Sequence, residues 1–553
     1  MKIFLKRNAF FGVLFLVVFG LGLVHLVIFR YTMNPDGISY LDIGDAFWRG
    51  DWSGALTTYW SPLYPFILGF ALWLMGFSPA TEFTVVHIVN FLLYLGSFAA
   101  FLFFLRTLLD HEEIVDAHDR ALFFIFGTSI FLTVALSMIT ISHVTPDMLV
   151  ALLMYAVSGL FIIFRTQPQT WHYIVLGSIL GLGYLTKAIL FPYALVVLVL
   201  VFLVVKKDRT KNFGLGVAGS IFLLCVLPWA FSISVAKEQF TFGDTGAINY
   251  AWFNNGVRPF IHWQGEGDAG APTHPTRKVF DNPVVYEFND GHAVTYAPWF
   301  DPGYWYAGLR PHISLLNIIR TSWDGFSMLA SDMMYYFSFI LLMIAGIWWR
   351  EENKREAFWK FWRAYFPLVI SSSIILGLYV AVSVESRYTA PFLVIVPAVF
   401  FVSIYASVKK RDLPYARIVV VAGTILAVLI TGARNMYDVT HLFISNPRHY
   451  HLEVADGLRE IGVPEGEPMA YIGHGSGGMS AYWARLLRAE IIAEVPEEGQ
   501  KMFVEGSVEM RREVLKAFAG AGARWAVWEY APAWAQEEGW RRIDQTVYFL
   551  RKL

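Results

Sequence analysis

The stretch NAFFGVLFLVVFGLGLVHLVIF (residues 8–29) is a continuous apolar run, and it leads into the polar sequence NPDGISYLDIG (34–44). A helix needs about 20 apolar residues to cross the roughly 30 Å of hydrocarbon in a bilayer. The run meets this length, exceeds the apolar part of a usual signal peptide and lacks a small-x-small cleavage site. The sequence therefore predicts a retained membrane helix whose end brings Asp36 to a bilayer surface.

Similar apolar runs recur to about residue 433, and the composition agrees with them. Of the 553 residues, 56% are hydrophobic and 16% are charged, and the mean hydropathy of +0.48 lies outside the range of ordinary soluble proteins. A net charge of −1 argues against a nucleic-acid partner. The single cysteine, Cys225, excludes an intrachain disulfide and a cysteine-rich metal site. We therefore predict a polytopic α-helical membrane protein over residues 1–435.

Basic clusters predict the orientation, because short cytoplasmic loops collect Lys and Arg. Such clusters lie at residues 2–7, 206–211, 350–363 and 409–411. All four fall on the cytoplasmic side, together with the N-terminus, only if PLYPFILGFALWLMG (62–76) does not cross the membrane. This segment is short and begins with two prolines in its first four residues, as expected for an interfacial or re-entrant helix in the first external loop.

This choice predicts about eleven spans. They lie near residues 8–29, 83–105, 120–140, 147–164, 172–186, 189–205, 214–235, 328–349, 364–383, 389–407 and 415–432. The external side then receives the loops 31–82 and 236–327, both part of the membrane module, and the whole region 440–553. Several polar groups inside the apolar pattern fall on that side, although they were not used to choose the orientation.

Two of these groups are carboxylates at the heads of predicted helices. Asp36 follows the first span, and Asp147, in ISHVTPDMLVALLMY (141–155), opens another. Each fits a simple N-cap and each also fits a catalytic carboxylate, so both interpretations stay open. Tyr40 follows Asp36 by four residues and would share its helix face. His143 is more typical of a structural turn residue, but its spacing from Asp147 leaves metal coordination open.

Two cationic side chains fall on the same side. Lys187, in GLGYLTKAILFPY (181–193), interrupts a long apolar stretch, where a charge is costly unless it finds a partner or reaches water. It is either a lysine that extends to the surface or a counter-ion for a lipid phosphate. Arg387, in Glu385-Ser386-Arg387-Tyr388, either forms a forked pair with phosphate or simply pairs with Glu385.

The order of these motifs resembles that of the GT-C superfamily of membrane glycosyltransferases, in the branch of protein O-mannosyltransferases and bacterial aminoarabinose transferases. The motifs are DGISY (36–40), SPLYP (61–65), TPD (145–147), GLGYLTK (181–187) and ESRY (385–388). The resemblance covers roughly residues 1–435. It implies a GT-C fold and an inverting glycosyltransferase that moves a sugar from a polyprenyl-phosphate donor to a hydroxyl of a lipid, glycan or protein acceptor. It also implies the extracytoplasmic face of a bacterial inner (plasma) membrane.

The resemblance also implies roles for particular residues. The catalytic base of the family falls on Asp36 and its second acidic position falls on Asp147. Lys187 and Arg387 fall near the lipid phosphate. We predict a further substrate-binding group of Tyr40, Glu385 and Tyr388. No cofactor is assigned, and use of a divalent metal stays open, because Gly37 stands where an acidic residue often follows the first aspartate.

Two other functions would also place charges near a membrane cleft. One is a transporter or flippase for lipids or glycolipids, and the other is a non-catalytic GT-C-like scaffold. Transporters typically carry internal repeats and polar residues near the midplane of the bilayer. The sequence has no evident repeat and few charges within its apolar runs, so it favours the transferase.

The external loop 236–327 is longer than a connector needs to be, and it is rich in aromatic residues, as in HAVTYAPWFDPGYWYAG (292–308). Aromatic faces suit sugar rings, and a long loop over a site can act as a lid. The alternative is a compact cap that packs its aromatic residues against one another. Both interpretations stay open.

Residues 440–553 alternate between helix and strand patterns and predict a small extracytoplasmic α/β domain. The predicted helices are 450–461, 478–487 and 500–520, and the predicted strands are 469–473, 489–495, 524–529 and 544–551. GHGSGG (473–478) matches a dinucleotide-binding pattern, but a tight strand-to-helix turn explains these glycines better, since dinucleotides are scarce outside the cytoplasm.

Overall fold

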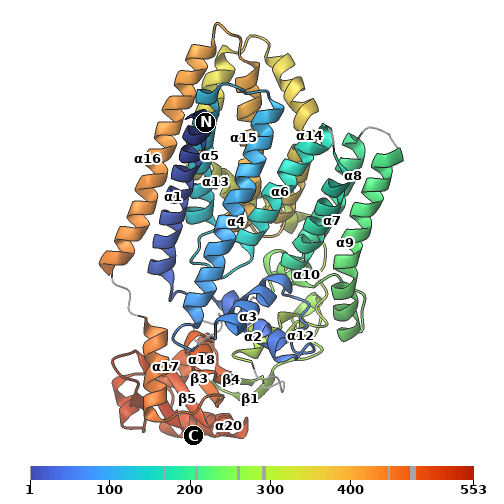
Figure 1. Ribbon diagram of the computed structural model, residues 1–553. Coiled ribbons are helices and arrows are strands. Elements are labelled where there is room, and N and C mark those ends of the chain that lie inside the picture. Colours follow the sequence, from blue (N-terminus) through green and yellow to red (C-terminus); the bar gives the residue numbers. More distant parts are fainter. Residues whose placement is uncertain are drawn as a thin grey trace.

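The computed structural model describes residues 2–76, 78–166, 168–205, 209–257, 262–288, 294–445, 449–473 and 481–553. These residues form a long helical bundle joined at one end to a smaller α/β region that contains the C-terminus (Figure 1). The strand-to-helix turn predicted at 473–478 lies outside the described residues, apart from Gly473.

The described residues include a helix at each of the eleven predicted spans. These helices are α1 (Lys2–Phe29), α4 (Glu82–His111), α5 (Ala117–Thr133) continued by the π-turn η1 (Val134–Met138), α6 (Asp147–Arg165), α7 (Thr170–Thr186), α8 (Leu190–Val204), α9 (Arg209–Ala236), α13 (Leu315–Arg350), α14 (Lys354–Val380), α15 (Ser386–Ser407) and α16 (Leu413–Ser445). Among the described residues, nine helices are long and apolar enough to cross a membrane. The exceptions among the eleven are α7 and α8, which have only 17 and 15 residues.

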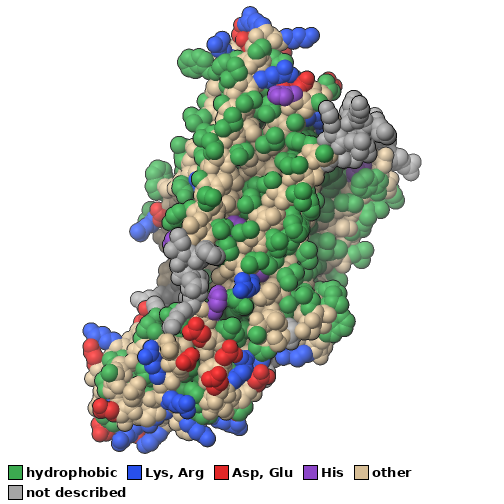
Figure 2. Space-filling model, turned by 60° about the vertical axis from the view of Figure 1, so that its left-hand side comes forward, with side chains coloured by type: hydrophobic (Ala, Val, Ile, Leu, Met, Phe, Trp, Pro, Cys, Tyr) green, Lys and Arg blue, Asp and Glu red, His purple; other side chains and the backbone are tan. Residues whose placement is uncertain are grey.

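The surface of the bundle matches a lipid environment. Large hydrophobic side chains are exposed along its outer helices, for example Leu224 (73% exposed) on α9 and Leu429 (63%) on α16. Figure 2 shows hydrophobic side chains over the length of the bundle, whereas charged side chains lie mostly at its two ends and over the α/β region. An apolar band between charged ends is the pattern of a membrane-spanning protein, so the chain is an integral membrane protein.

The segment 62–76 forms the short helix α3 (Leu63–Met75), which lies beside α2 (Pro35–Arg49) at the end of the bundle near the α/β region (Figure 1). The two helices touch through glycines. A Cβ on Gly69 would lie 2.5 Å from the carbonyl oxygen of Gly44, so neither position accepts a side chain without moving the backbone. At 13 residues, α3 is too short to span a bilayer.

Cysteine labelling tests the predicted side of α3. In a Cys225→Ser background, Phe70→Cys should react with an impermeant thiol reagent from the extracytoplasmic side, because the Phe70 side chain is 41% exposed and α3 does not cross. Asp208→Cys, in a basic cluster, should react only from the cytoplasm. Cytoplasmic labelling at position 70 together with external labelling at position 208 would overturn the predicted orientation.

Between α9 and α13, the loop 236–327 folds into short elements. They are α10 (Thr245–Asn254), η2 (Gly267–Ala269), β1 (Arg277–Asp281), β2 (Val284–Glu287), α11 (Ala297–Phe300) and α12 (Pro302–Trp305). Its aromatic residues pack closely, as in the stacked rings of Trp252 and Trp299 with centroids 5.9 Å apart. The loop therefore includes a packed aromatic cap and also a two-stranded ribbon.

The C-terminal region has the predicted alternation, with two differences. Its elements are α17 (Tyr450–Ile461), β3 (Pro468–Ile472), α18 (Ala481–Leu487), β4 (Glu490–Val495), α19 (Glu497–Glu505), α20 (Val508–Gly520), β5 (Trp525–Glu529), η3 (Ala533–Gln536), β6 (Arg541–Arg542) and β7 (Tyr548–Lys552). The helix predicted at 500–520 is two helices, because Ser507 caps α20 by accepting a hydrogen bond from the Met510 amide. The strand predicted at 544–551 is the second half of a β6–β7 hairpin.

The sheet joins the C-terminal region to the loop 236–327. Its strand order is β1-β2-β4-β3-β5-β7-β6, with β3 parallel to both β4 and β5. Strand β2 pairs antiparallel to β4, with Tyr286 opposite Glu494. The separate domain predicted at 440–553 stays a prediction, but its sheet is completed by two strands from the membrane module.

A buried ion cluster also connects the C-terminal region with α2. The Arg485 guanidinium on α18 lies 2.6 Å from Asp42 Oδ1 and 2.7 Å from Asp45 Oδ2, both on α2. It also pairs with Glu82 at the start of α4. Burial opposes ionisation of Asp45, but Arg485 and Arg488 together hold the pKa of this carboxyl below its usual range. The cluster therefore fixes the C-terminal region to the helix that carries Asp36.

Candidate active site

Asp36 and Asp147 are brought together by Asn34, the residue that precedes α2. The Asn34 side chain accepts a hydrogen bond from the Val144 amide at 2.7 Å and donates one to the Val144 carbonyl at 3.4 Å. Asp36 is in the first turn of α2 and Asp147 is the first residue of α6. The two segments, far apart in the sequence, are thus fixed side by side with both carboxylates at helix N-termini.

Lys187 ends α7 and pairs with Asp147. Its backbone is extended (φ −157°, ψ 123°), and its Nζ lies 2.7 Å from Asp147 Oδ1. The ammonium also lies 3.6 Å from the ring centroid of Tyr388, a cation–π contact. Because the Asp147 side chain is only 3% exposed, this lysine provides the buried carboxylate with a counter-ion.

Arg387, at the start of α15, lies between the two aspartates. Its Nη2 is 3.6 Å from Asp36 Oδ2, and its Nη1 is 3.8 Å from Asp147 Oδ2. Its Nε donates to Glu385 Oε2 at 2.6 Å, and the Glu385 side chain remains 44% exposed. The pair with Glu385 that the sequence left open is therefore present, and the same guanidinium still faces both aspartates.

These groups line one cavity of about 480 Å³. All seven predicted site residues contribute to its wall: Asp36, Tyr40, Asp147, Lys187, Glu385, Arg387 and Tyr388. Most of the remaining wall is apolar or aromatic. Tyr40 belongs to the aromatic part, because its ring packs edge-on against Trp60 and Tyr64 with centroids 5.0 and 5.3 Å apart.

The cavity changes the acidity of Asp36. Burial raises the pKa of this carboxyl above its usual range, and the nearby Arg387 partly offsets the increase. A carboxylate with a raised pKa holds an abstracted proton better at neutral pH than a fully exposed aspartate does. The geometry therefore presents a basic oxygen 3.6 Å from the Arg387 guanidinium, in a cavity that Lys187 also lines, and this combination suits deprotonation near a departing anion.

Sequence reasoning missed several aromatic residues in the wall. They are Tyr59, Trp60, Trp252, Trp299 and Tyr379. The Trp299 carbonyl accepts hydrogen bonds from Ser39 Oγ at 2.8 Å and from Trp60 Nε1 at 3.2 Å, which ties the aromatic cap to α2. The density of aromatic residues in the loop was visible in the sequence, but the contact with α2 was not.

Metal ligands were a further open point. Among the described residues, one group of three side chains has the spacing of cation ligands, namely Asp116, His118 and Asp119. Asp116 precedes α5, the other two lie in its first turn, and none of them lines the cavity. Asp116 already accepts hydrogen bonds from the His118 and Asp119 amides, and Asp119 pairs with Arg417. His143 Nδ1 lies 2.8 Å from Thr140 Oγ1 within its own turn. We assign no metal to these side chains.

No known protein-family model matches the sequence, and no curated protein is significantly similar to it. The structure, however, aligns with ArnT from Cupriavidus metallidurans in the apo state over 98% of both chains, with a TM-score of 0.54 and 13% identity. The chain has the ArnT fold. The GT-C fold expected from the order of the motifs is therefore confirmed. A second ArnT structure, bound to undecaprenyl phosphate, aligns over 98% of this chain and 97% of that one, with a TM-score of 0.48 and 14% identity.

Proposed function

We propose that the chain is an inverting glycosyltransferase that moves a sugar from a polyprenyl-phosphate donor to an acceptor hydroxyl at the extracytoplasmic membrane face. One observation carries the proposal. Asp36, Asp147, Lys187 and Arg387 come from four separate segments and line one cavity of a GT-C fold. The alternatives of a flippase or a scaffold do not require a carboxylate with a raised pKa in a cavity that two cations also line.

Each reacting group has a candidate partner in this cavity. The Asp36 carboxylate accepts the proton of the acceptor hydroxyl, and the acceptor oxygen forms a bond to the anomeric carbon. The bond between that carbon and the phosphate oxygen breaks, and the electron pair leaves with the polyprenyl phosphate. Arg387 and Lys187 stabilise the phosphate as its negative charge grows. Asp147 positions both cations through its ion pairs.

The wall of the cavity fits the two ends of such a donor. Among its aromatic residues, Trp60 and Trp299 suit a sugar ring. Its apolar residues include Phe191, Phe242 and Leu378, which suit a prenyl chain. Lys187 and Arg387 line the same cavity and supply positive charge for the phosphate that joins sugar and lipid.

Donor turnover by the purified full-length protein tests the proposal. Detergent-solubilised protein should consume a polyprenyl-phosphate sugar in the presence of a membrane extract and release polyprenyl phosphate, detected by mass spectrometry. Glycans or glycolipids of a deletion strain should lack one sugar. If no donor is consumed and the deletion strain has unchanged glycans but an altered distribution of lipids between the leaflets, the flippase is the correct function.

Neutralising Lys187 should weaken donor binding. Lys187→Met removes a charge-assisted contact to the phosphate, and such contacts contribute about 1.5–3 kcal/mol, so the Kd should rise roughly 10- to 150-fold. Lys409→Met, at the opposite end of the bundle, is the matched control and should leave the Kd unchanged. Binding of a non-transferable donor analogue measures the effect. An unchanged Kd in Lys187→Met would refute the phosphate role.

The pH dependence of kcat/KM should report on Asp36. The carboxylate must be deprotonated to act, so activity falls as the pH drops through the pKa of Asp36. Burial raises this pKa and Arg387 lowers it, so Arg387→Gln should move the acid limb to higher pH. A limb that stays in place, or moves to lower pH, would contradict the assignment of the base.

A further inference from the structure

The end of the bundle opposite the α/β region holds a second, wide cleft of about 1220 Å³. It lies between the C-terminus of α6 and the N-terminal part of α14. Five of its lining side chains are basic, namely Arg165, Lys354, Arg355, Lys360 and Arg363. Two are acidic, Glu352 and Glu356, so the lining carries a clear excess of positive charge.

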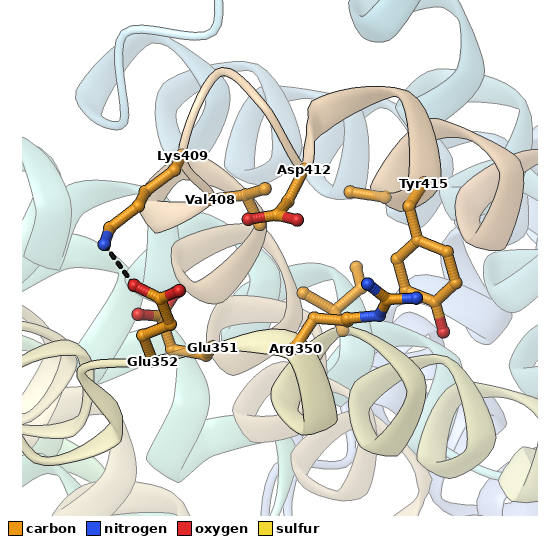
Figure 3. Close-up of a pocket in the computed structure, with 9 residues that line it drawn as sticks. Arg350, Glu351, Glu352, Val408, Lys409, Asp412 and Tyr415 are labelled. Atoms are coloured by element: carbon orange, nitrogen blue, oxygen red, sulfur yellow. Dashed lines mark hydrogen bonds and ion pairs between the residues drawn. The ribbon is translucent and has the colours of Figure 1, made fainter.

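The acidic groups near the cleft leave several of these cations uncompensated. Glu352 pairs with Lys409 and Arg411, which lie in the turn between α15 and α16, and Figure 3 shows Glu352 facing Lys409. Lys360 lies 3.7 Å from Glu112. Across the part of the chain that the structure describes, no carboxylate lies within 4.0 Å of the Arg165, Arg355 or Arg363 guanidinium. The cleft therefore presents arginines that can accept an anion.

The cleft lies where a bilayer surface is expected. Arg165 is the last residue of α6 and Lys354 is the first of α14, and the α13–α14 turn is at the end of the bundle farthest from the C-terminus (Figure 1). Trp359, which is 46% exposed, lines the cleft, and Trp349, at the C-terminal end of α13, is 84% exposed. Basic residues at helix ends together with exposed tryptophans mark the headgroup level of a membrane.

We infer that this cleft binds the headgroup phosphate of an anionic phospholipid. Arginine guanidinium groups match the geometry of phosphate oxygens and bind them through paired hydrogen bonds. The exposed rings of Phe358 and Trp359 give the acyl chains an apolar surface beside the headgroup. A zwitterionic lipid would bring its own ammonium into the basic cleft and bind less well. A soluble phosphate would lack the contact with these rings.

Lipid binding to the purified full-length protein tests the inference. Delipidated protein in neutral detergent is titrated with phosphatidylglycerol or phosphatidylcholine, and bound lipid is counted by native mass spectrometry. Wild type should prefer phosphatidylglycerol. The double variant Arg355→Gln/Arg363→Gln should bind it roughly 25-fold more weakly at low salt, because each basic residue near an anionic lipid contributes about a fivefold factor.

The matched control is Arg106→Gln/Arg120→Gln. This control also removes two positive charges at the same end of the bundle, but both of its arginines already pair with Asp110. Its phosphatidylglycerol affinity should equal that of wild type. Any of three results would overturn the inference. The two double variants could lose the same amount of phosphatidylglycerol affinity, or wild type could bind both lipids with equal affinity. Glycerol phosphate could also displace the lipid at matched concentration. The polyprenyl-donor assay is independent of this result, since the cleft and the active-site cavity share no lining residue.

Discussion

Asp36→Asn is expected to lower turnover by about 10²–10⁴-fold, the usual contribution of a positioned general base. Asparagine has nearly the shape of aspartate, so α2 and its contacts with Arg387 should persist. Its amide cannot take a proton from the acceptor hydroxyl at neutral pH. The loss should therefore appear in kcat, measured as polyprenyl phosphate released per enzyme, while the Kd of the donor changes little.

The control for this prediction is Asp110→Asn, which removes a carboxylate that is 53% exposed at the other end of the bundle. It should retain wild-type turnover. Near-normal turnover in Asp36→Asn would remove the base from the proposed mechanism. A loss confined to donor affinity would instead indicate that Asp36 acts by holding Arg387, 3.6 Å away.

The sequence singled out residues that the structure brings into one cavity, because each of them interrupts an apolar pattern at the end of a helix. Asp147 and Lys187 both flank runs that must end at a membrane surface, so local hydrophobicity was enough to place them on one side. It was not enough to pair them. The 2.7 Å contact between them depends on how α6 and α7 pack, and that packing has no local signal.

The sheet was predicted only in part, for a related reason. Strands β3, β4 and β5 are buried, apolar and flanked by helices, so their pattern is clear within a short window. The ribbon β1–β2 has only five and four residues and pairs with a strand far away in the sequence. Pairing at long range follows from tertiary structure, so the sequence did not show that β1 and β2 join the sheet of the C-terminal region.

The sequence also contained no indication of the Arg485 cluster. Removing the Arg485 guanidinium should have the largest effect on stability. Arg485 is 2% exposed, and its partners Asp42 and Glu82 are 6% and 0% exposed. Arg485→Met would leave Asp42 buried without a cation and Glu82 with only Arg488, 3.3 Å away, and such a loss costs about 3–5 kcal/mol in comparable sites. The melting temperature in detergent should fall sharply, and activity should fall with it because α2 carries Asp36.

A matched surface variant separates this effect from a general loss of charge. Lys516→Met removes a cation of the same region that is 73% exposed and pairs with Glu513, itself 55% exposed, and it should cost no more than about 1 kcal/mol. In the Arg485→Met background, Asp42→Asn should recover part of the stability, because one uncompensated buried charge disappears. If Arg485→Met and Lys516→Met have the same melting temperature, the cluster does not hold the C-terminal region against α2, and the shared sheet alone must do so.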